Sequence, residues 1–234
     1  MTPYLNAGSV VLYHGDAREI LADAPPAFAH CVVTDPPYGM AYHDGQNVSV
    51  RADSARQGIR MMRGLLADLD RCLVSPSHVY VFCHRWSMPD FMDTLAPYFA
   101  MRNLLVWDKG TPGRGDLTNY WFQFELVLFA SKGERKALTG GRGRSIIAES
   151  APRNRWHPTQ KPVPLLRLLI EKSTLPGECV VDPFAGAGST LVAAALSGRA
   201  ALGAEIEERY CETSARRIEA ALRGEAEPPA EANA

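Results

Sequence analysis

The strongest candidate for chemistry is the segment 34–39, which reads Thr-Asp-Pro-Pro-Tyr-Gly and follows an apolar run. Pro36 and Pro37 have no backbone N–H, so the turn offers hydrogen-bond acceptors and almost no donors. Asp35 adds a carboxylate, which only accepts hydrogen bonds when ionised, and Tyr38 adds a flat aromatic face. This combination suits a planar ring with an amino group, because the amine can donate to Asp35 and the Pro36 carbonyl while the ring stacks on Tyr38. The alternative is a strand that ends in a Pro-Pro turn with an N-capping aspartate.

A second motif lies at 179–190, where Cys-Val-Val-Asp-Pro-Phe-Ala-Gly-Ala-Gly-Ser-Thr predicts a strand, a glycine loop and the start of a helix. Gly186 and Gly188 permit a tight turn and close approach of a ligand to the backbone. The free N–H groups of the following helix favour an anionic group. Leu191 stands where the dinucleotide fingerprint needs its third glycine, and no Gly-Lys-Ser/Thr follows. The motif therefore disfavours a phosphate, whereas a carboxylate or an amino-acid group would fit.

An acidic residue follows this cradle at a meaningful distance. Glu205 ends the next expected strand, seventeen residues after Gly188, close to the offset of about 20 at which such a residue binds a ribose diol. A ligand with a ribose but no pyrophosphate indicates S-adenosylmethionine. The alternative is that Glu205 is a solvated strand end and the glycines form a simple helix turn. Asp16, after the first expected strand, could contact the adenine amine of such a ligand or cap a helix.

Hydrophobic periodicity predicts the elements that must position these motifs. The expected strands are 9–14, 28–34, 78–83, 101–107, 121–130, 179–182 and 200–205, and the expected helices are 17–22, 59–73, 88–97, 163–173, 188–196 and 207–222. The segments 39–57, 108–119 and 133–156 are expected to be loops. Strands that alternate with helices predict an α/β fold: a doubly wound, mostly parallel, Rossmann-like sheet in a single domain.

The composition is that of an ordinary soluble globular protein, with 46% hydrophobic and 22% charged residues in 234. No apolar run approaches the ~18 residues that a membrane span needs, and the N-terminus does not resemble a signal peptide. The five cysteines lack Cys-x-x-Cys spacing, which is typical of buried thiols in a reducing compartment and argues against zinc or disulfides. Cys83, His84 and His157 are therefore expected to be structural, although His157 could line a base pocket.

The net charge of −1 conceals a basic segment. Residues 132–167 contain nine Lys and Arg against two Glu, and an acidic C-terminal tail offsets them in the total. A basic surface of this kind can bind a polyanion. The alternative is a solvated face whose charges are balanced by other residues.

Taken together, these motifs resemble those of the amino-specific DNA methyltransferases, which methylate N6 of adenine or N4 of cytosine. The resemblance rests on Gly15-Asp16, Asp35-Pro-Pro-Tyr38, His157-Pro-Thr-Gln-Lys-Pro162, Asp182-Pro-Phe-Ala-Gly-Ala-Gly-Ser-Thr190 and Glu205. The first aspartate motif precedes the glycine loop by 147 residues, which is the permuted, β-type order of that family. The resemblance implies a bacterial or phage-encoded cytoplasmic enzyme that acts on double-stranded DNA and could form a homodimer.

The resemblance also implies a role for each matching residue. Asp35, Pro36, Pro37 and Tyr38 would grip a flipped base; Asp182, Phe184, Gly186, Gly188 and Thr190 would border the methionine part of S-adenosylmethionine; Glu205 would hold its ribose; Lys161 and Pro162 would close the pocket; and Asp16 would lie near the adenine. A tetrapeptide that begins with Asp is commoner in the adenine-specific members, which favours adenine.

The chain departs from the family pattern in two respects: members generally carry a sizeable target-recognition region near the His157 segment, and this chain is short, which leaves sequence specificity weakly encoded or dependent on a second subunit. Only 111–156 is free to serve as a target-recognition region, within a domain expected over 1–223 that precedes a disordered acidic tail at 224–234. The alternatives are N4 of cytosine, RNA as substrate, or a catalytically silent nucleic-acid-binding module on the same scaffold.

Overall fold

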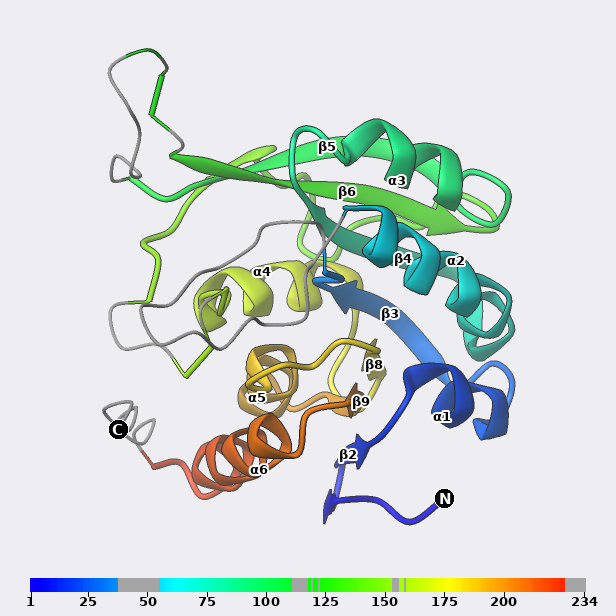
Figure 1. Cartoon of the computed structure of the whole chain (residues 1–234), viewed down its shortest axis with the longest axis vertical. Coiled ribbons are helices and arrows are strands. Elements are labelled where there is room, and N and C mark those ends of the chain that lie inside the picture. The colour runs from blue at the N-terminus through cyan, green and yellow to red at the C-terminus, as the bar shows by residue number, and fades with distance from the viewer. Residues whose placement is uncertain are drawn as a thin grey trace.

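The computed structural model describes residues 1–37, 55–110, 118, 120–121, 123–152, 156–157 and 159–225. This part of the chain contains a nine-stranded sheet with the order β1-β2-β9-β8-β3-β4-β6-β5-β7 (Figure 1). Its strands are β1 (Leu5–Ala7), β2 (Val10–His14), β3 (Ala29–Thr34), β4 (Leu73–Cys83), β5 (Ala100–Asp108), β6 (Phe124–Lys132), β7 (Ile146–Ala148), β8 (Cys179–Asp182) and β9 (Ala200–Glu205).

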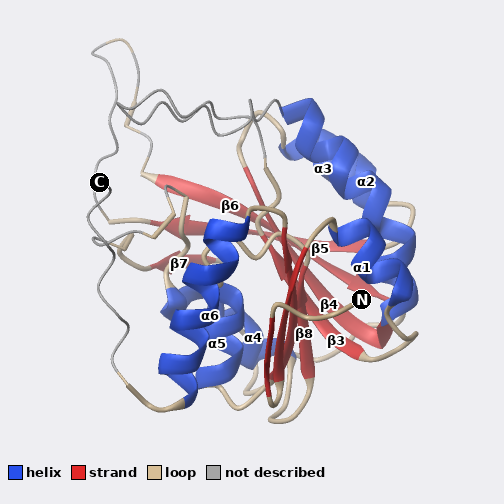
Figure 2. Ribbon diagram, turned by 60° about the horizontal axis from the view of Figure 1, so that its bottom comes forward, coloured by secondary structure: helices blue, strands red, loops and turns tan. Residues whose placement is uncertain are grey.

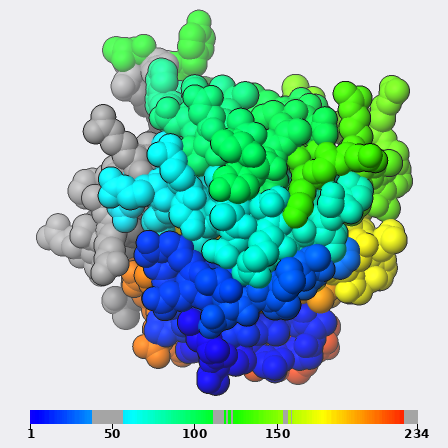
Figure 3. All heavy atoms as spheres, turned by 90° about the vertical axis from the view of Figure 1, so that its right-hand side faces the viewer, coloured from blue at the N-terminus to red at the C-terminus, as the bar shows by residue number. Residues whose placement is uncertain are grey.

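Helices cover both faces of this sheet, so the core has three layers. The helices are α1 (Ala17–Asp23), α2 (Ala55–Cys72), α3 (Met88–Leu95), α4 (Val163–Ser173), α5 (Ser189–Leu196) and α6 (Glu208–Leu222). Figure 2 shows α1, α2 and α3 on one side of the strands and α4, α5 and α6 on the other. The outer face of the first layer is seen in Figure 3, where the α2 region lies between that of α1 and that of α3. This is the doubly wound α/β fold that the alternation of strands and helices predicts.

The central strands are parallel, and their connections reverse direction between β3 and β8. From β8 the chain passes through α5 to β9, whereas from β3 it runs towards α2 and β4 on the opposite side. Such a reversal leaves a crevice beyond the carboxyl ends of the two strands, where open α/β sheets bind their ligands. The register pairs Cys31 with Val180 and Val32 with Val181, so both strands end at the same edge of the sheet.

Burial explains why the central strands read as continuous apolar runs. Val32, Val33 and Val181 are fully buried, because helices cover the parallel strands on both faces. The amphipathic helix α4 contributes Leu166 and Ile170 to the same core. The core therefore fixes the ends of β3 and β8, and with them the residues that follow.

Several element boundaries differ from the predictions. Leu73, predicted to be helical, begins β4, so this strand starts before residue 78 and contains Pro76. Pro76 is tolerated because the β3–β4 register is interrupted there: Ala29 pairs with Leu73, and the next pair is Cys31 with His78.

The short edge strands β1 and β7 were not predicted, and β6 begins at Phe124 rather than at 121. The predicted loop at 39–57 lies outside the described residues up to 54, and its last residues belong to α2. Most of the predicted loop at 108–119, and the tail from 226, also lie outside them. In the described part of the chain, no helix is both long and apolar enough to cross a membrane.

Candidate active site

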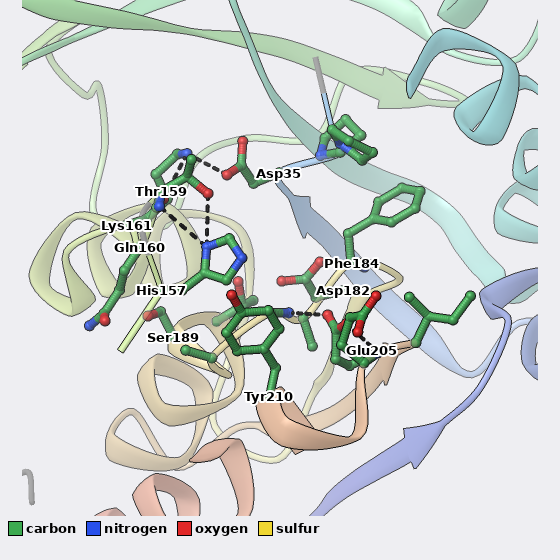
Figure 4. Close-up of a pocket in the computed structure, with 18 of the residues that line it drawn as sticks. Asp35, His157, Thr159, Gln160, Lys161, Asp182, Phe184, Ser189, Glu205 and Tyr210 are labelled. Carbon is green, nitrogen blue, oxygen red and sulfur yellow. Dashed lines mark hydrogen bonds and ion pairs between the residues drawn. The ribbon is translucent and has the colours of Figure 1, made fainter. Parts of the chain in front are cut away.

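The two motifs meet at the carboxyl edge of the sheet. Asp35 directly follows β3, and Asp182 ends the neighbouring β8. Thr34 Oγ1 donates a hydrogen bond of 2.8 Å to Asp182 Oδ1, so the segments are joined although 148 residues separate these two in sequence. Figure 4 shows Asp35 and Asp182 among the residues that line one cavity, with Glu205 and Tyr210 across from Asp35.

This cavity has a volume of about 390 Å³, within the range of about 300–1,000 Å³ that small-molecule sites occupy. Most of the predicted site residues line it, namely Asp35, Pro36, Pro37, Lys161, Asp182, Phe184, Gly186, Thr190 and Glu205. His157 lines it as well. Residues from both ends of the chain therefore contribute to a single cavity.

Three predicted site residues are not among the described residues that line the cavity, namely Asp16, Pro162 and Gly188. Tyr38 lies outside the described residues. Asp16 is the N-cap of α1, where it accepts a hydrogen bond of 2.9 Å from the Arg18 backbone N–H and also pairs with the Arg18 guanidinium. Pro162 is the N-cap residue of α4. Asp16 thus takes the helix-capping alternative in this structure.

The two glycines of the loop have different roles. Gly186 has a φ of +53°, and a Cβ added there would meet nothing within 4 Å, so its backbone borders open space in the cavity. Gly188 has a φ of +77°, and its Cβ would lie 2.6 Å from Ser214 Oγ and 3.1 Å from Ser214 Cα. The absence of a side chain at Gly188 therefore lets α6 pack against the loop, rather than letting a ligand approach.

Helix α6 also fixes the shape of this loop. Ser214 Oγ donates a 2.8 Å hydrogen bond to the Gly186 carbonyl, and the buried Arg217 guanidinium donates to the Ala187 carbonyl. Because these carbonyls are held by α6, the loop is positioned before any ligand binds.

Glu205 connects the loop to the end of β9. Its Oε2 accepts a hydrogen bond of 2.8 Å from Gly186 N–H, and its Oε1 accepts one of 2.8 Å from Glu207 N–H. A carboxylate has about four lone-pair sites, so further sites can accept hydrogen bonds from a ligand. Burial raises the pKa of Glu205.

Asp35 is held on one side only. Lys161 Nζ donates to its Oδ2, whereas its buried Oδ1 has no hydrogen-bond partner among the described residues. Burial raises the pKa of Asp35 to about 7, with a smaller contribution from Glu125, although Lys161 opposes the shift. A buried acceptor without a partner costs about 1–3 kcal/mol. A ligand that donates a hydrogen bond would remove this cost.

The ammonium group of Lys161 lies between two carboxylates. Lys161 lines the cavity, and its ammonium group contacts Asp35 Oδ2 and lies 3.2 Å from Glu125 Oε2. Glu125 was not predicted as a site residue. The one signal for it in the sequence is a single charge inside the apolar run of β6.

Three further residues that were not predicted line the cavity after β9, namely Ile206, Arg209 and Tyr210. The ring of Tyr210 packs edge-on against His157, with centroids 4.4 Å apart. Burial lowers the pKa of His157 to about 4, so the ring is neutral at pH 7. Its Nδ1 accepts a hydrogen bond of 3.2 Å from Thr159 N–H, which leaves the proton on Nε2.

The charges of the lining indicate the kind of ligand that fits. It contains the carboxyl groups of Asp35, Asp182, Glu205 and Glu207, against the cations Lys161 and Arg209. An excess of carboxylates favours a cationic ligand with hydroxyl or amine donors. The described residues contain no group of His, Cys, Asp and Glu that could hold a metal ion.

Several cations of the predicted basic segment pair with other groups of the same chain. Lys132 pairs with Asp70 at 3.3 Å, Lys136 donates to the Ser173 carbonyl at 2.8 Å, and Arg167 pairs with Glu171 at 3.2 Å. Arg142 and Arg144 are exposed. The sequence count of cations therefore overstates the charge that is available to a polyanion.

Comparison with known proteins gives a consistent result. The profile of the N6/N4 DNA methylase family matches residues 29–216. DNA adenine methyltransferase YhdJ of Escherichia coli (strain K12) is 27% identical over 253 residues, which cover 92% of this chain and 85% of that protein. The structure of M1.HpyAVI in complex with SAM superimposes with a TM-score of 0.69 at 25% identity, covering 88% of this chain and 97% of the other.

The cytosine-N4-specific PvuII DNA methyltransferase superimposes with a TM-score of 0.72 at 16% identity, covering 95% of this chain and 96% of the other. At that identity the similarity is one of fold. Because similar proteins are named for adenine and for cytosine, the fold does not distinguish between the two bases.

Proposed function

The chain belongs to the N6/N4 family of DNA methylases. On that premise we propose that the protein binds S-adenosylmethionine in this cavity and methylates N6 of adenine in double-stranded DNA. The observation that carries this proposal is the hydrogen bond from Thr34 to Asp182, because it places Asp35 beside the glycine loop. The N4-cytosine alternative uses the same geometry.

The residues of the cavity fit this cofactor. Glu205 has spare lone pairs for a ribose diol, and Gly186 leaves open space beside the backbone. Asp182 and Phe184 would border the methionine part, and the surplus of carboxylates suits a sulfonium cation. Ile206 and Tyr210 also line the cavity, and the adenine would lie against their apolar surface.

The bound cofactor would supply an electrophilic methyl group on its sulfonium. Asp35 Oδ1 and the Pro36 carbonyl would accept the two hydrogens of the substrate amine, which directs the nitrogen lone pair away from the ring plane. The chain therefore acts through positioning and through negative charge aimed at the cation that develops on nitrogen. No covalent enzyme intermediate is needed.

The base must leave the duplex to reach Asp35. Flipping costs a few kcal/mol, and stacking on an aromatic side chain recovers part of it. Tyr38 is proposed for this stacking. The exposed Arg142 and Arg144 would contact phosphates, so binding should weaken as salt increases. An Asp at the start of the tetrapeptide supports adenine.

The identity of the base can be tested directly. The protein is incubated with genomic DNA and S-adenosylmethionine that carries a labelled methyl group, and the DNA is digested to nucleosides. We expect the label in N6-methyl-2′-deoxyadenosine. Label in N4-methyl-2′-deoxycytidine would replace adenine by cytosine, and label found only in a parallel incubation with RNA would contradict a DNA substrate.

The rate of methyl transfer is expected to increase with pH through about 7. The pKa of Asp35 is raised from 3.8 to about 7, and only the ionised carboxylate accepts from the amine, so activity is lost as pH falls through that pKa. Each unit below it should reduce the single-turnover rate about tenfold. A rate that stays constant down to about pH 5 would contradict an ionised Asp35.

We also propose a homodimer, on the basis of the family resemblance. Sedimentation velocity would detect a species of twice the 25.6 kDa chain mass, and a single monomeric species over the whole concentration range would contradict it.

A further inference from the structure

Glu125 is an unusual residue for its position. It lies in β6, where its neighbours Leu126 and Val127 are buried, and its own side chain is only 16% exposed. A buried carboxylate is costly unless cations or hydrogen-bond donors compensate it. The structure therefore needs a reason for a charge at this position, and the motifs of the site do not supply one.

Two lysines compensate this charge. Glu125 Oε1 lies 2.6 Å from Lys109 Nζ, and Oε2 lies 3.2 Å from Lys161 Nζ. Together they hold the pKa of Glu125 down at about 2, although burial alone would raise it. Glu125 is thus ionised throughout the pH range in which the enzyme can be assayed.

Lys161 links Glu125 to the proposed catalytic carboxylate. Its buried ammonium contacts Asp35 Oδ2, Glu125 Oε2 and the Thr159 carbonyl at 3.2 Å. An ammonium group carries three hydrogens, so it can donate to each of these acceptors. Charges of alternating sign therefore run from Lys109 through Glu125 and Lys161 to Asp35.

Asp35 faces several other titratable groups. Asp182 of β8 contributes a further negative charge, whereas Cys83 of β4 stays neutral because burial raises its pKa to about 12. His157 is also neutral at pH 7, since its pKa is lowered to about 4. Among the described residues, Lys161 is therefore the cation that opposes Glu125 and Asp182 beside Asp35.

We propose that Glu125 is a positioning residue for methyl transfer: it shares the Lys161 ammonium with Asp35, so that Asp35 is held at Oδ2 but remains a strong hydrogen-bond acceptor at Oδ1. An ammonium group that pairs with one carboxylate alone lowers the basicity of that carboxylate more than an ammonium group that is shared between two carboxylates. The inference rests on the proposed function, because it assigns the purpose of the network to the substrate amine.

The network predicts shifts of opposite sign in two variants. Glu125→Gln removes a negative charge, so that Lys161 pairs with Asp35 alone. The acid limb of the pH profile, in which the single-turnover rate rises with pH, should therefore move to lower pH by roughly 1 unit. The plateau rate should fall about tenfold, because a less basic acceptor is weaker. Lys161→Met removes the cation, so the limb should move to higher pH by about 1–3 units.

The experiment measures single-turnover transfer of labelled methyl to DNA between about pH 5 and pH 9. Glu178→Gln is the matched control. Glu178 accepts a hydrogen bond of 2.8 Å from the Leu175 N–H, and it precedes β8, away from the carboxyl edge of the sheet. Its limb and plateau should equal those of the wild type. The Kd for S-adenosylmethionine in all variants should stay within about threefold of the wild-type value, because Glu205 and the glycine loop are unchanged.

A purely structural role for Glu125 would reduce stability without moving the limb. If both variants shift in the same direction, or if Glu125→Gln keeps the wild-type profile, the inference is overturned. If Glu125→Gln does not fold, Lys109→Met is used instead, because it removes a more exposed cation of the same network. Its limb should move to higher pH, and an unchanged limb would overturn the inference. A wild-type protein that methylates no DNA base would instead overturn the proposed function.

Discussion

Replacement of Asp35 by alanine is expected to abolish methyl transfer while S-adenosylmethionine still binds. Asp35 Oδ1 is the buried acceptor without a partner, and its loss removes the group that would orient the amine and stabilise its developing charge. A reduction of at least about 10³-fold in the single-turnover rate is expected. The Kd for the cofactor, measured by calorimetric titration, should change by less than about threefold because Glu205 and the glycine loop are untouched.

Asp93→Ala is the matched control, because Asp93 is exposed on α3 on the opposite face of the sheet. It should keep the wild-type rate. Full activity of Asp35→Ala would contradict the mechanism. Loss of both activity and cofactor binding would indicate that the substitution had disturbed the whole cavity.

Glu205→Ala is expected to weaken cofactor binding first. The substitution removes the carboxylate proposed to hold the ribose hydroxyls, and hydrogen bonds to a charged group contribute about 1.5–3 kcal/mol each. The Kd for S-adenosylmethionine should therefore rise by roughly 10- to 100-fold. With the cofactor at saturating concentration, the rate of methyl transfer should recover much of its wild-type value.

The same carboxylate also accepts from Gly186 N–H and Glu207 N–H, so its loss could disturb the loop. Glu205→Gln separates these effects, because an amide keeps one acceptor for the backbone. Glu212→Ala, an exposed change on α6, serves as the control and should leave the Kd unchanged. Unaltered cofactor affinity in Glu205→Ala would mean that the ribose lies elsewhere.

The site could be predicted from the sequence where its chemistry is local. Asp35 and Asp182 each directly follow or end a buried strand, and parallel strands end at one edge of a sheet. Their approach therefore follows from the order of strands and helices. Nine of the predicted site residues line the cavity, because the glycine loop and the strand ends are short segments with a strong backbone preference.

The remaining features depend on contacts between distant elements. Glu125 contacts Lys109 and Lys161, and it reaches the site because β6 pairs with the end of β4. The local sequence does not indicate that pairing. Gly188 looks like a ligand-binding glycine, yet its partner is Ser214 of α6. Asp16 could cap a helix or contact a ligand, and only the geometry of α1 separates these roles.

The boundaries of β4 have a similar explanation. Leu73 continues the helical spacing of α2, but it pairs with Ala29 of β3. Tertiary pairing thus overrides the local pattern. The edge strands β1 and β7 are three residues each, too short for their periodicity to indicate a strand.

The proposed function requires that the Asp35 turn and the glycine loop serve one reaction. The most direct test is a crystal structure of the protein with S-adenosylmethionine. The ribose should lie on Glu205, and the sulfonium methyl should point towards Asp35 within about 6 Å, which leaves room for one amine nitrogen between them. A cofactor bound elsewhere, or bound there with its methyl group directed away from Asp35, would contradict the account.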